Sequence, residues 1–383
     1  MPIPEQRNLD KARGVIRDWL AGQLPDVKEL SISPLIGPAF TGFSNETLIF
    51  DASWTEGGEP RSEGYVIRVK PTAHTIFLES DFDSQYRVIK ALSEHTDVPL
   101  PTVHWFEDDE SVLGAPFFVM GKVEGNVPSD NPPYTQTGWL LDEATPAVRQ
   151  QVVESGLDAL TRIHQTDWRK LELDFLDKPQ YGALGIEQQI TYYERSLEWA
   201  AQGKPQPIAE AALDWVRANK PSEQHIALAW GDARINNQMF DDDGNVVAVF
   251  DWEMVTLADP MMDLAWWLFL DRHFHEGMPA PGAQGEMYGG GPPGVPRMEG
   301  FPTREQMLAR YEELTGWQPH DIEFYEVFAG LRFAVVMMRI ASLVVEFELL
   351  PSDTDMGTNN IVTRLLAAKL GLPSPGAEPL PAV

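Results

Sequence analysis

Three polar residues in one short segment have the types and spacing needed for phosphoryl transfer. Residues 230–237 read Trp-Gly-Asp-Ala-Arg-Ile-Asn-Asn, and Asp251 follows a predicted β-hairpin. Phosphoryl transfer requires positioning, metal ions on the phosphate oxygens and a carboxylate beside the attacking hydroxyl. We expect Asp232 to accept the substrate proton and Arg234 to reach the transferring phosphoryl group. Asn237 and Asp251 would hold Mg²⁺, which prefers oxygen ligands.

Each of these residues also has a purely structural interpretation. Asp232 and Asn237 could cap turns, and Asp251 could simply end a strand. The joint spacing around a hairpin favours the chemical interpretation over three separate caps. Asp259 and Asp263 are instead expected to be structural. Asp259 directly precedes Pro260, which predicts that it caps the N-terminus of a helix.

This segment resembles the catalytic and metal loops of the aminoglycoside phosphotransferase and choline kinase families. The family pattern is His-Gly-Asp, four residues, Asn, and then a hairpin that ends in Asp. Trp230 stands here in place of the His, as in a bacterial subgroup of phosphotransferase-like proteins that residues 132–134, 252–254 and 265–267 also fit. The resemblance implies a protein-kinase-like fold and transfer of the γ-phosphate of ATP or GTP, with Mg²⁺, to a small-molecule hydroxyl.

The resemblance also implies a phosphate-binding region in the first third of the chain. Residues 42–47 (Gly-Phe-Ser-Asn-Glu-Thr) resemble the short turn over the nucleotide phosphates, which makes Ser44 and Asn45 binding residues. Arg68 stands where many kinases have a phosphate-binding Lys, and a guanidinium can bond two phosphate oxygens. Lys70 lies on the same strand face and is the alternative cation.

Two further nucleotide contacts follow from the same resemblance. Gln85 stands where a Glu on the next helix usually pairs with the cation; its amide could hydrogen-bond Arg68, or Glu79 or Asp81 could replace it. Met120 and Val123 belong to the strand and hinge that would present backbone groups to the purine.

The hydrophobic patterns predict an α+β, bilobal chain, with a β-rich N-terminal lobe (1–121) and a larger, mostly helical lobe (122–383). The first lobe has strands around 31–38, 44–52, 64–69, 103–107 and 116–120, an acidic turn at 108–111, and helices at 8–22 and 82–93. The second has helices at 145–168, 187–200, 208–219, 259–274, 303–316 and 321–348. A hairpin of 238–240 and 246–250 supplies its only predicted strands.

Composition narrows the classes of partner. With 29 Lys and Arg against 58 Asp and Glu, the formal net charge is −29, which opposes binding to nucleic acid. There is no cysteine, so disulfides, thiolate catalysis and cysteine-bound metals are excluded. Residues 1–10 lack an apolar signal core, and the apolar run 328–345 contains two arginines, which predicts a buried helix rather than a membrane span. A cytoplasmic protein is expected, and a homodimer stays open.

The sequence does not identify the acceptor substrate. Arg332 and Arg339, two helical turns apart, share a face and could bind an anionic acceptor or pair with carboxylates. His164 is expected to be structural, and residues 277–302 form either a lid or a disordered loop. Two other classes compete with the kinase: an inactive pseudokinase, suggested by Trp230 and Gln85, and a hydrolase with paired carboxylates, which lacks a nucleophile elbow.

Overall fold

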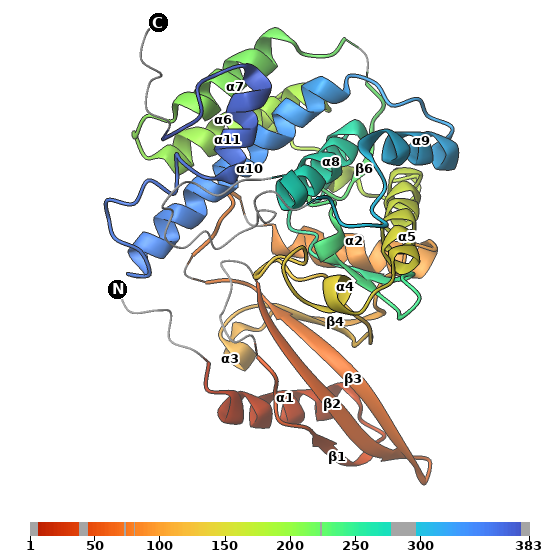
Figure 1. The fold of residues 1–383 in the computed structure, drawn as a ribbon. Coiled ribbons are helices and arrows are strands. Elements are labelled where there is room, and N and C mark those ends of the chain that lie inside the picture. The colour runs from red at the N-terminus through yellow and green to blue at the C-terminus, as the bar shows by residue number, and fades with distance from the viewer. Residues whose placement is uncertain are drawn as a thin grey trace, which may run out of the picture.

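The chain forms two lobes, as the sequence predicts (Figure 1). The computed structural model describes residues 7–37, 45–72, 74–79, 81–222, 224–276 and 296–376. The smaller lobe is built on a five-stranded antiparallel sheet, and the larger lobe is mostly helical. The last strand of the sheet ends at Gly121, while the lobe boundary itself stays a prediction.

The sheet of the small lobe is covered on both faces. Its strand order is β1-β2-β3-β5-β4, with β1 (Lys28–Ile32), β2 (Glu46–Glu56), β3 (Glu59–Val69), β4 (Val103–Glu107) and β5 (Phe117–Gly121). Side chains alternate between the faces: Phe117 packs with helix α1 (Leu9–Gln23), and Phe118 packs with helix α2 (Phe82–His95). Ile67 lies on the α1 side, so the neighbouring Arg68 faces the α2 side.

The helices of the large lobe follow the sequence pattern closely. They are α4 (Trp139–Asp142), α5 (Pro146–His164), α6 (Ile186–Ala201), α7 (Pro207–Ala218), α8 (Met261–Glu276), α9 (Arg304–Thr315), α10 (Ile322–Glu346) and α11 (Ile361–Leu370). Sequence analysis predicted α5 to α10 but neither α4 nor α11. Asp259 accepts a hydrogen bond from the Met261 amide at 2.9 Å, so its expected capping role is confirmed.

Two corrections concern short elements. The hairpin of β7 (Gln238–Phe240) and β8 (Val246–Val249) is confirmed, but the expectation of no further strands in this lobe is wrong. Strand β6 (Ala227–Ala229) pairs with β9 (Thr256–Ala258). Such short strands are too brief to show an alternating pattern. The acidic turn expected at 108–111 contains a short helix, α3 (Glu110–Leu113), whose N-cap is Asp109.

Helix α10 forms the centre of the large lobe. Among the described residues it is the one helix long and apolar enough to cross a membrane, yet 78% of its most apolar window is buried within the fold. It packs along α6, α7, α8 and α11. This burial confirms the predicted core helix.

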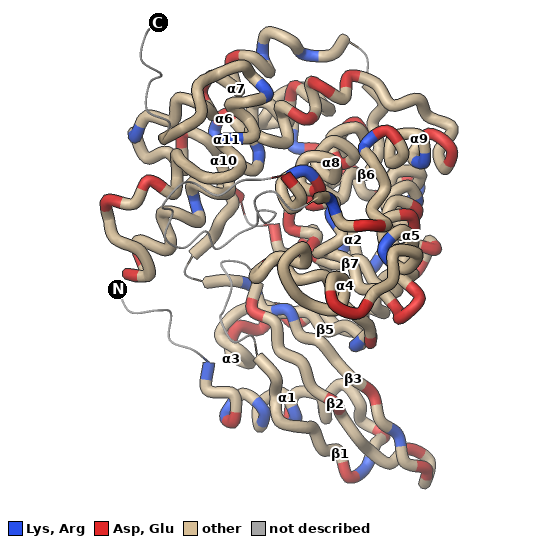
Figure 2. The backbone as a smooth tube through the Cα atoms, viewed as in Figure 1, with Lys and Arg blue, Asp and Glu red and all other residues tan. Residues whose placement is uncertain are grey.

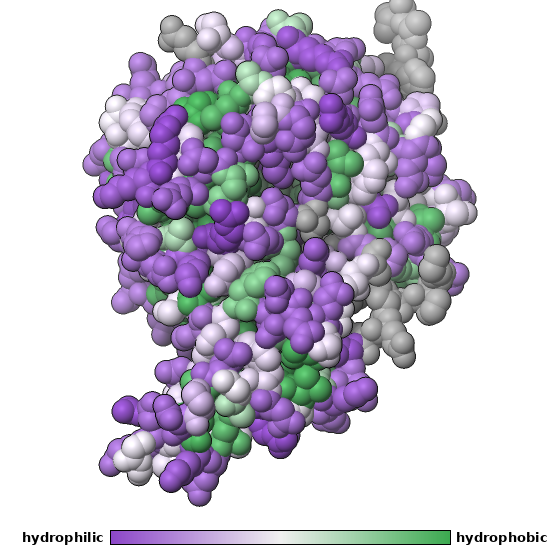
Figure 3. All heavy atoms as spheres, turned by 180° about the vertical axis from the view of Figure 1, so that it is seen from behind, coloured by the Kyte–Doolittle hydropathy of each residue, from purple (hydrophilic) through white to green (hydrophobic). Residues whose placement is uncertain are grey.

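Charged residues are spread over both lobes. Acidic side chains occur on the hairpin of the small lobe and on the helices of the large lobe (Figure 2). The face shown in Figure 3 is mostly hydrophilic, with smaller hydrophobic areas between. The acidic excess is therefore a general property of the surface rather than one local patch.

Candidate active site

The loop after β6 passes very close to the segment after Asp251. Gly231 has a φ of 93°, and a Cβ added there would lie 2.0 Å from the carbonyl oxygen of Met254. Only glycine combines this left-handed conformation with so close an approach. The pairing of β6 with β9 fixes the ends of both segments, so the two predicted functional loops lie against each other.

A buried carboxylate anchors the start of this loop. Asp263, which is fully buried, accepts hydrogen bonds from the backbone amides of Trp230 at 2.6 Å and Gly231 at 2.9 Å. Its Oδ2 also lies 3.1 Å from His164 Nε2, and His164 Nδ1 lies 2.8 Å from the Tyr311 hydroxyl. The structural roles expected for Asp263 and His164 are therefore confirmed.

The Asp232 side chain is held by three donors. Trp266 on α8 donates its indole N–H to Oδ1 at 2.8 Å. The Asn237 amide donates to Oδ2 at 2.7 Å, and Arg234 Nε lies 3.2 Å from the same oxygen. These bonds fix the carboxylate before any substrate binds, which is the preorganisation that catalysis by positioning requires.

Asp130 is a site residue that sequence analysis missed. It lies in the Pro- and Asn-rich segment after the hinge, and its carboxylate accepts a hydrogen bond from Arg234 Nη1. Burial raises the pKa of Asp130 above its usual value, and the Arg234 charge opposes that rise. Burial acts to lower the pKa of Arg234, but Asp130, Asp232 and Asp251 raise it overall, so Arg234 stays a cation.

Trp230 supports the backbone of the second loop. Its side chain is fully buried, and the indole N–H lies 3.0 Å from the Asp251 carbonyl oxygen and 3.2 Å from that of Phe250. Asp251 itself has a φ of 62°, a strained conformation for a residue other than glycine. The tryptophan that replaces the family histidine thus fixes the residue expected to bind metal.

The oxygen atoms of Asn237 and Asp251 suit Mg²⁺ as ligands. The Asn237 Nδ2 donates to Asp232, and its Oδ1 has no hydrogen bond to a residue that the structure describes. Burial raises the pKa of Asp251, whereas Arg68 and Arg234 act to lower it. Among the described residues no group of three or more His, Asp or Glu could hold a metal alone. Mg²⁺ in general keeps several waters and binds substrate phosphates alongside one or two carboxylates.

Arg68 has a different partner from the one the sequence suggested. Its Nη1 donates to Thr47 Oγ1 at 2.9 Å, and its Nη2 lies 3.4 Å from Glu253 Oε1. Gln85 instead accepts a hydrogen bond from the Asn45 side chain at 2.9 Å, so the expected Gln85 bond to Arg68 is absent among the described contacts. Glu253, two residues after Asp251, therefore connects the large lobe to Arg68 on β3 of the small lobe.

Glu79 and Asp81, the two carboxylates predicted to be able to replace Gln85, contact other residues. Glu79 binds the Tyr181 hydroxyl and Lys178 Nζ, the latter at 3.2 Å, and Asp81 lies 3.9 Å from the same lysine. Among the described contacts of Arg68 there is none with either carboxylate. Both instead connect the start of α2 to the large lobe.

Of the other residues predicted to bind the nucleotide, Met120 and Val123 lie in or just after β5. Met120 lies within β5, paired with Val66 on one side and Val103 on the other. Val123 follows the strand, two residues after Gly121. Ser44 and residues 277–295 of the expected lid lie outside the described residues.

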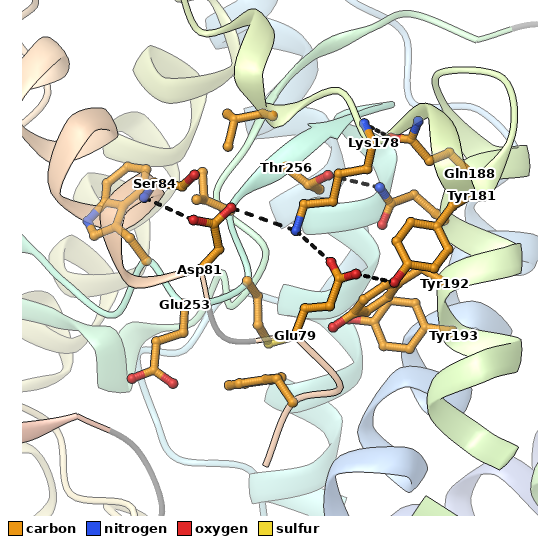
Figure 4. Close-up of a pocket in the computed structure, with 16 residues that line it drawn as sticks. Glu79, Asp81, Ser84, Lys178, Tyr181, Gln188, Tyr192, Tyr193, Glu253 and Thr256 are labelled. Carbon is orange, nitrogen blue, oxygen red and sulfur yellow. Dashed lines mark hydrogen bonds and ion pairs between the residues drawn. The ribbon is translucent and has the colours of Figure 1, made fainter. Parts of the chain in front are cut away.

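A pocket adjoins the segment that follows Asp251 (Figure 4). Trp252 and Glu253, which directly follow Asp251, form one wall, and Tyr192 and Tyr193 of α6 form another. The Lys178 side chain reaches between Glu79 and Asp81 at its rim. Its lining mixes carboxylates, one amine and phenol rings, so it can offer hydrogen bonds and flat apolar surfaces together.

Neither arginine of α10 pairs with a carboxylate among the described residues. Arg332 Nη2 donates to the Gly231 carbonyl at 2.6 Å, and Arg339 Nε donates to the Thr75 carbonyl at 2.8 Å. The expectation of carboxylate pairing is therefore wrong. The reason is that α6 presents aromatic rings to this face of α10, at Tyr193 and Trp199.

Known proteins resemble this chain in sequence and in fold. The model of the phosphotransferase enzyme family (APH) matches residues 43–301. A solved protein from Ralstonia eutropha, a candidate aminoglycoside phosphotransferase, shares 26% identity with a TM-score of 0.62, covering 90% of this chain and 92% of its own. A type I macrolide 2′-phosphotransferase shares the fold, with 16% identity, a TM-score of 0.55, and coverage of 99% and 100%.

The curated relatives are much longer proteins. IBR3 of Arabidopsis thaliana, named as an acyl-CoA dehydrogenase, is 27% identical over 321 residues, which are 79% of this chain but 35% of that protein. Acyl-CoA dehydrogenase family member 11 of Gallus gallus is 31% identical over 229 residues, 59% of this chain and 26% of that protein. The chain thus spans about a quarter to a third of these relatives.

Proposed function

We propose, because this chain belongs to the phosphotransferase enzyme family, that it transfers the γ-phosphate of a magnesium–nucleotide complex to the hydroxyl of a small molecule. The observation that carries the proposal is the fixed carboxylate of Asp232, which lies beside Arg234 and within one cluster with Asn237 and Asp251. This is the constellation that phosphoryl transfer requires.

Each residue of the cluster has a distinct part in the proposed reaction. Asp232 orients the acceptor hydroxyl and takes its proton as the oxygen attacks the γ-phosphorus and the bond to the β-phosphate oxygen breaks. Arg234, fixed between Asp130 and Asp232, offers positive charge to the transferring group. Asn237 and Asp251 would hold Mg²⁺, which neutralises phosphate charge when bound. Arg68 would bind phosphate oxygens on the other side.

The acceptor is proposed to enter beside Trp252 and Glu253, through the pocket of Figure 4. The names of the longer relatives point to acyl thioesters, so we propose a hydroxyacyl thioester as the first acceptor class to test. A phosphotransferase solved with ADP and hygromycin B supports the use of an adenine nucleotide, but at 15% identity it shares only the fold. Aminoglycosides and macrolides are the comparison acceptors.

The test combines nucleotide binding with an acceptor screen. Calorimetric titration with ATP and GTP, with and without Mg²⁺, is expected to show Mg²⁺-dependent binding that Asp251→Asn abolishes. Transfer to a hydroxyacyl thioester, an aminoglycoside or a macrolide is then followed by nucleoside diphosphate release. Asp232→Asn should lower the rate by about 10²- to 10⁴-fold, the usual contribution of a general base, and keep nucleotide affinity.

Asp108→Asn is the matched control, since that carboxylate lies on the β4–β5 connection of the small lobe. It should leave both measurements unchanged. Nucleotide binding without turnover on any acceptor, and without slow hydrolysis, would favour the pseudokinase. Absence of nucleotide binding would refute the proposal.

A further inference from the structure

We propose that Arg332 is a positioning residue for Asp232, although it lies on α10, far along the chain from the loop at residues 230–237. Its guanidinium would fix the peptide that precedes Asp232 and so set the direction of that carboxylate. The inference deepens the proposed function and rests on it for the meaning of Asp232. The contacts of Arg332 can be tested without any turnover.

The first observation is that Arg332 is buried and forms no ion pair with a carboxylate in the described part of the chain. The residue is 1% exposed, and its Nη2 donates to the Gly231 carbonyl at 2.6 Å. Its Nε and Nη1 have no hydrogen-bond partner among the described residues. A buried cation with unpartnered nitrogens is costly to the fold. Fold stability therefore does not explain an arginine at position 332. The contact of Arg332 with the Gly231 carbonyl offers an explanation.

A second link runs from Arg332 to Asp232 through an aromatic ring. The guanidinium carbon lies 4.5 Å from the centre of the Trp266 ring and 5.3 Å from that of Tyr193. Aromatic faces attract a cation and partly replace its lost hydration. Trp266 in turn donates its indole N–H to Asp232 Oδ1 at 2.8 Å. Arg332 thus contacts both the backbone before Asp232 and the ring that holds its carboxylate.

The bond to the Gly231 carbonyl is important because of the glycine itself. A glycine at a φ of 93° has little intrinsic preference for that conformation. Asp263 fixes its amide side, and Arg332 fixes its carbonyl side. Without the second bond, the peptide between Gly231 and Asp232 could rotate. A shift of about 1 Å in a reacting group can lower a rate about 10²-fold.

A purely structural role makes a different prediction. Replacing a buried charged group by an apolar side chain of similar size is often neutral or stabilising. If Arg332 only fills space, Arg332→Met should leave stability equal or higher and leave the loop unaffected. If it positions Asp232, the same variant should stay folded while the loop loosens and turnover falls.

The experiment compares Arg332→Met with Arg332→Lys and with a matched control, Arg149→Met. Within the described ranges Arg149 also donates only to backbone carbonyls, those of Leu140, Leu141 and Glu299, but it lies on α5 away from the loop. Hydrogen–deuterium exchange of the peptide covering 227–240 is measured with thermal unfolding. Mg–ATP hydrolysis, or transfer to the best acceptor found, supplies kcat and KM.

We expect faster exchange in the 227–240 peptide of Arg332→Met, and a fall in kcat of about 10- to 100-fold with KM for Mg–ATP unchanged. Arg332→Lys should recover part of both, and Arg149→Met should change neither. Unchanged exchange of the peptide in Arg332→Met would overturn the inference, as would equal losses in both Met variants. If the wild-type protein shows no turnover, the proposed function fails while the exchange measurement still decides the role of Arg332.

Discussion

Replacing Trp230 by Phe should weaken Mg²⁺-dependent nucleotide binding more than it weakens the fold. The change keeps an aromatic ring in a fully buried position and removes the indole N–H, which lies 3.0 and 3.2 Å from the carbonyl oxygens of Asp251 and Phe250. A net hydrogen bond is worth about 1 kcal/mol, and a buried carbonyl left unpartnered costs about 1–3 kcal/mol. The free energy of unfolding should therefore fall by about 2–3 kcal/mol.

The effect on binding follows from the conformation of Asp251. A φ of 62° costs about 1–3 kcal/mol for a residue of this kind and persists only while its surroundings enforce it. Releasing the carbonyl lets the residue relax, so each metal-binding event must restore the strained form. A penalty near 1 kcal/mol corresponds to about fivefold weaker Mg²⁺-dependent affinity. Nucleotide binding without Mg²⁺ should not change.

Calorimetric titration with ATP, with and without Mg²⁺, and denaturant unfolding measure the two quantities. Trp54→Phe is the matched control, because Trp54 is also buried but its indole nitrogen has no hydrogen-bond partner among the described residues. It should leave metal-dependent affinity unchanged. If Trp230→Phe lowers stability yet leaves Mg²⁺-dependent affinity intact, the indole only packs and the support of Asp251 is refuted.

Two further results are expected at the nucleotide side. Glu253→Gln should weaken nucleotide binding about fivefold, since the long contact with Arg68 is worth about 1 kcal/mol at most. Gln85→Glu should not strengthen nucleotide binding. A higher nucleotide affinity of Gln85→Glu in titrations would instead support the sequence-based prediction that residue 85 pairs with Arg68. Burial raises the pKa of Asp251, so a metal that needs the ionised form should dissociate above the usual aspartate range as pH falls. With the folded pKa raised, Asp251 contributes to apo stability below the unfolded pKa, and that contribution is lost as pH rises through the folded pKa. Metal titrations and unfolding curves between pH 4 and 8 measure these two pH dependences. A metal affinity that does not change with pH would contradict the assignment of Asp251 as a metal ligand.

The sequence predicted those parts of the site that depend on local order. The hairpin and the spacing of Asp232, Asn237 and Asp251 lie within about twenty consecutive residues, and turn chemistry and strand pattern suffice to place them. The helix predicted at 303–316 is α9, and the structure shows why its ends lie there: Thr303 and Gln306 form a capping box, and Gly316 adopts the left-handed conformation.

The parts that were missed depend on long-range contacts. Asp130 reaches Arg234 across 104 positions, and Arg332 reaches Gly231 across 101. Arg332 stands out as a charge within an apolar run, but the local sequence does not show that it bonds to the loop at Gly231. Asp130 lies in a segment rich in Pro, Asp and Asn, where an aspartate is common, so no local signal marks it. Glu253 was quoted only as part of a family-like stretch, because nothing in the chain order shows that it faces Arg68 rather than solvent. The β6–β9 pair was missed because three-residue strands leave no period to detect.

The tryptophan at position 230 also determines how the site responds to acidity. A histidine there would carry a group whose charge changes near neutral pH, with an ordinary pKa of about 6.5. An indole is a donor only and does not titrate in this range. The tie between residue 230 and the Asp251 carbonyl is therefore the same in an acidified and a neutral environment. The indole that supports the segment at Asp251 therefore does not change its protonation state with pH, whereas the carboxylates of the site can be protonated.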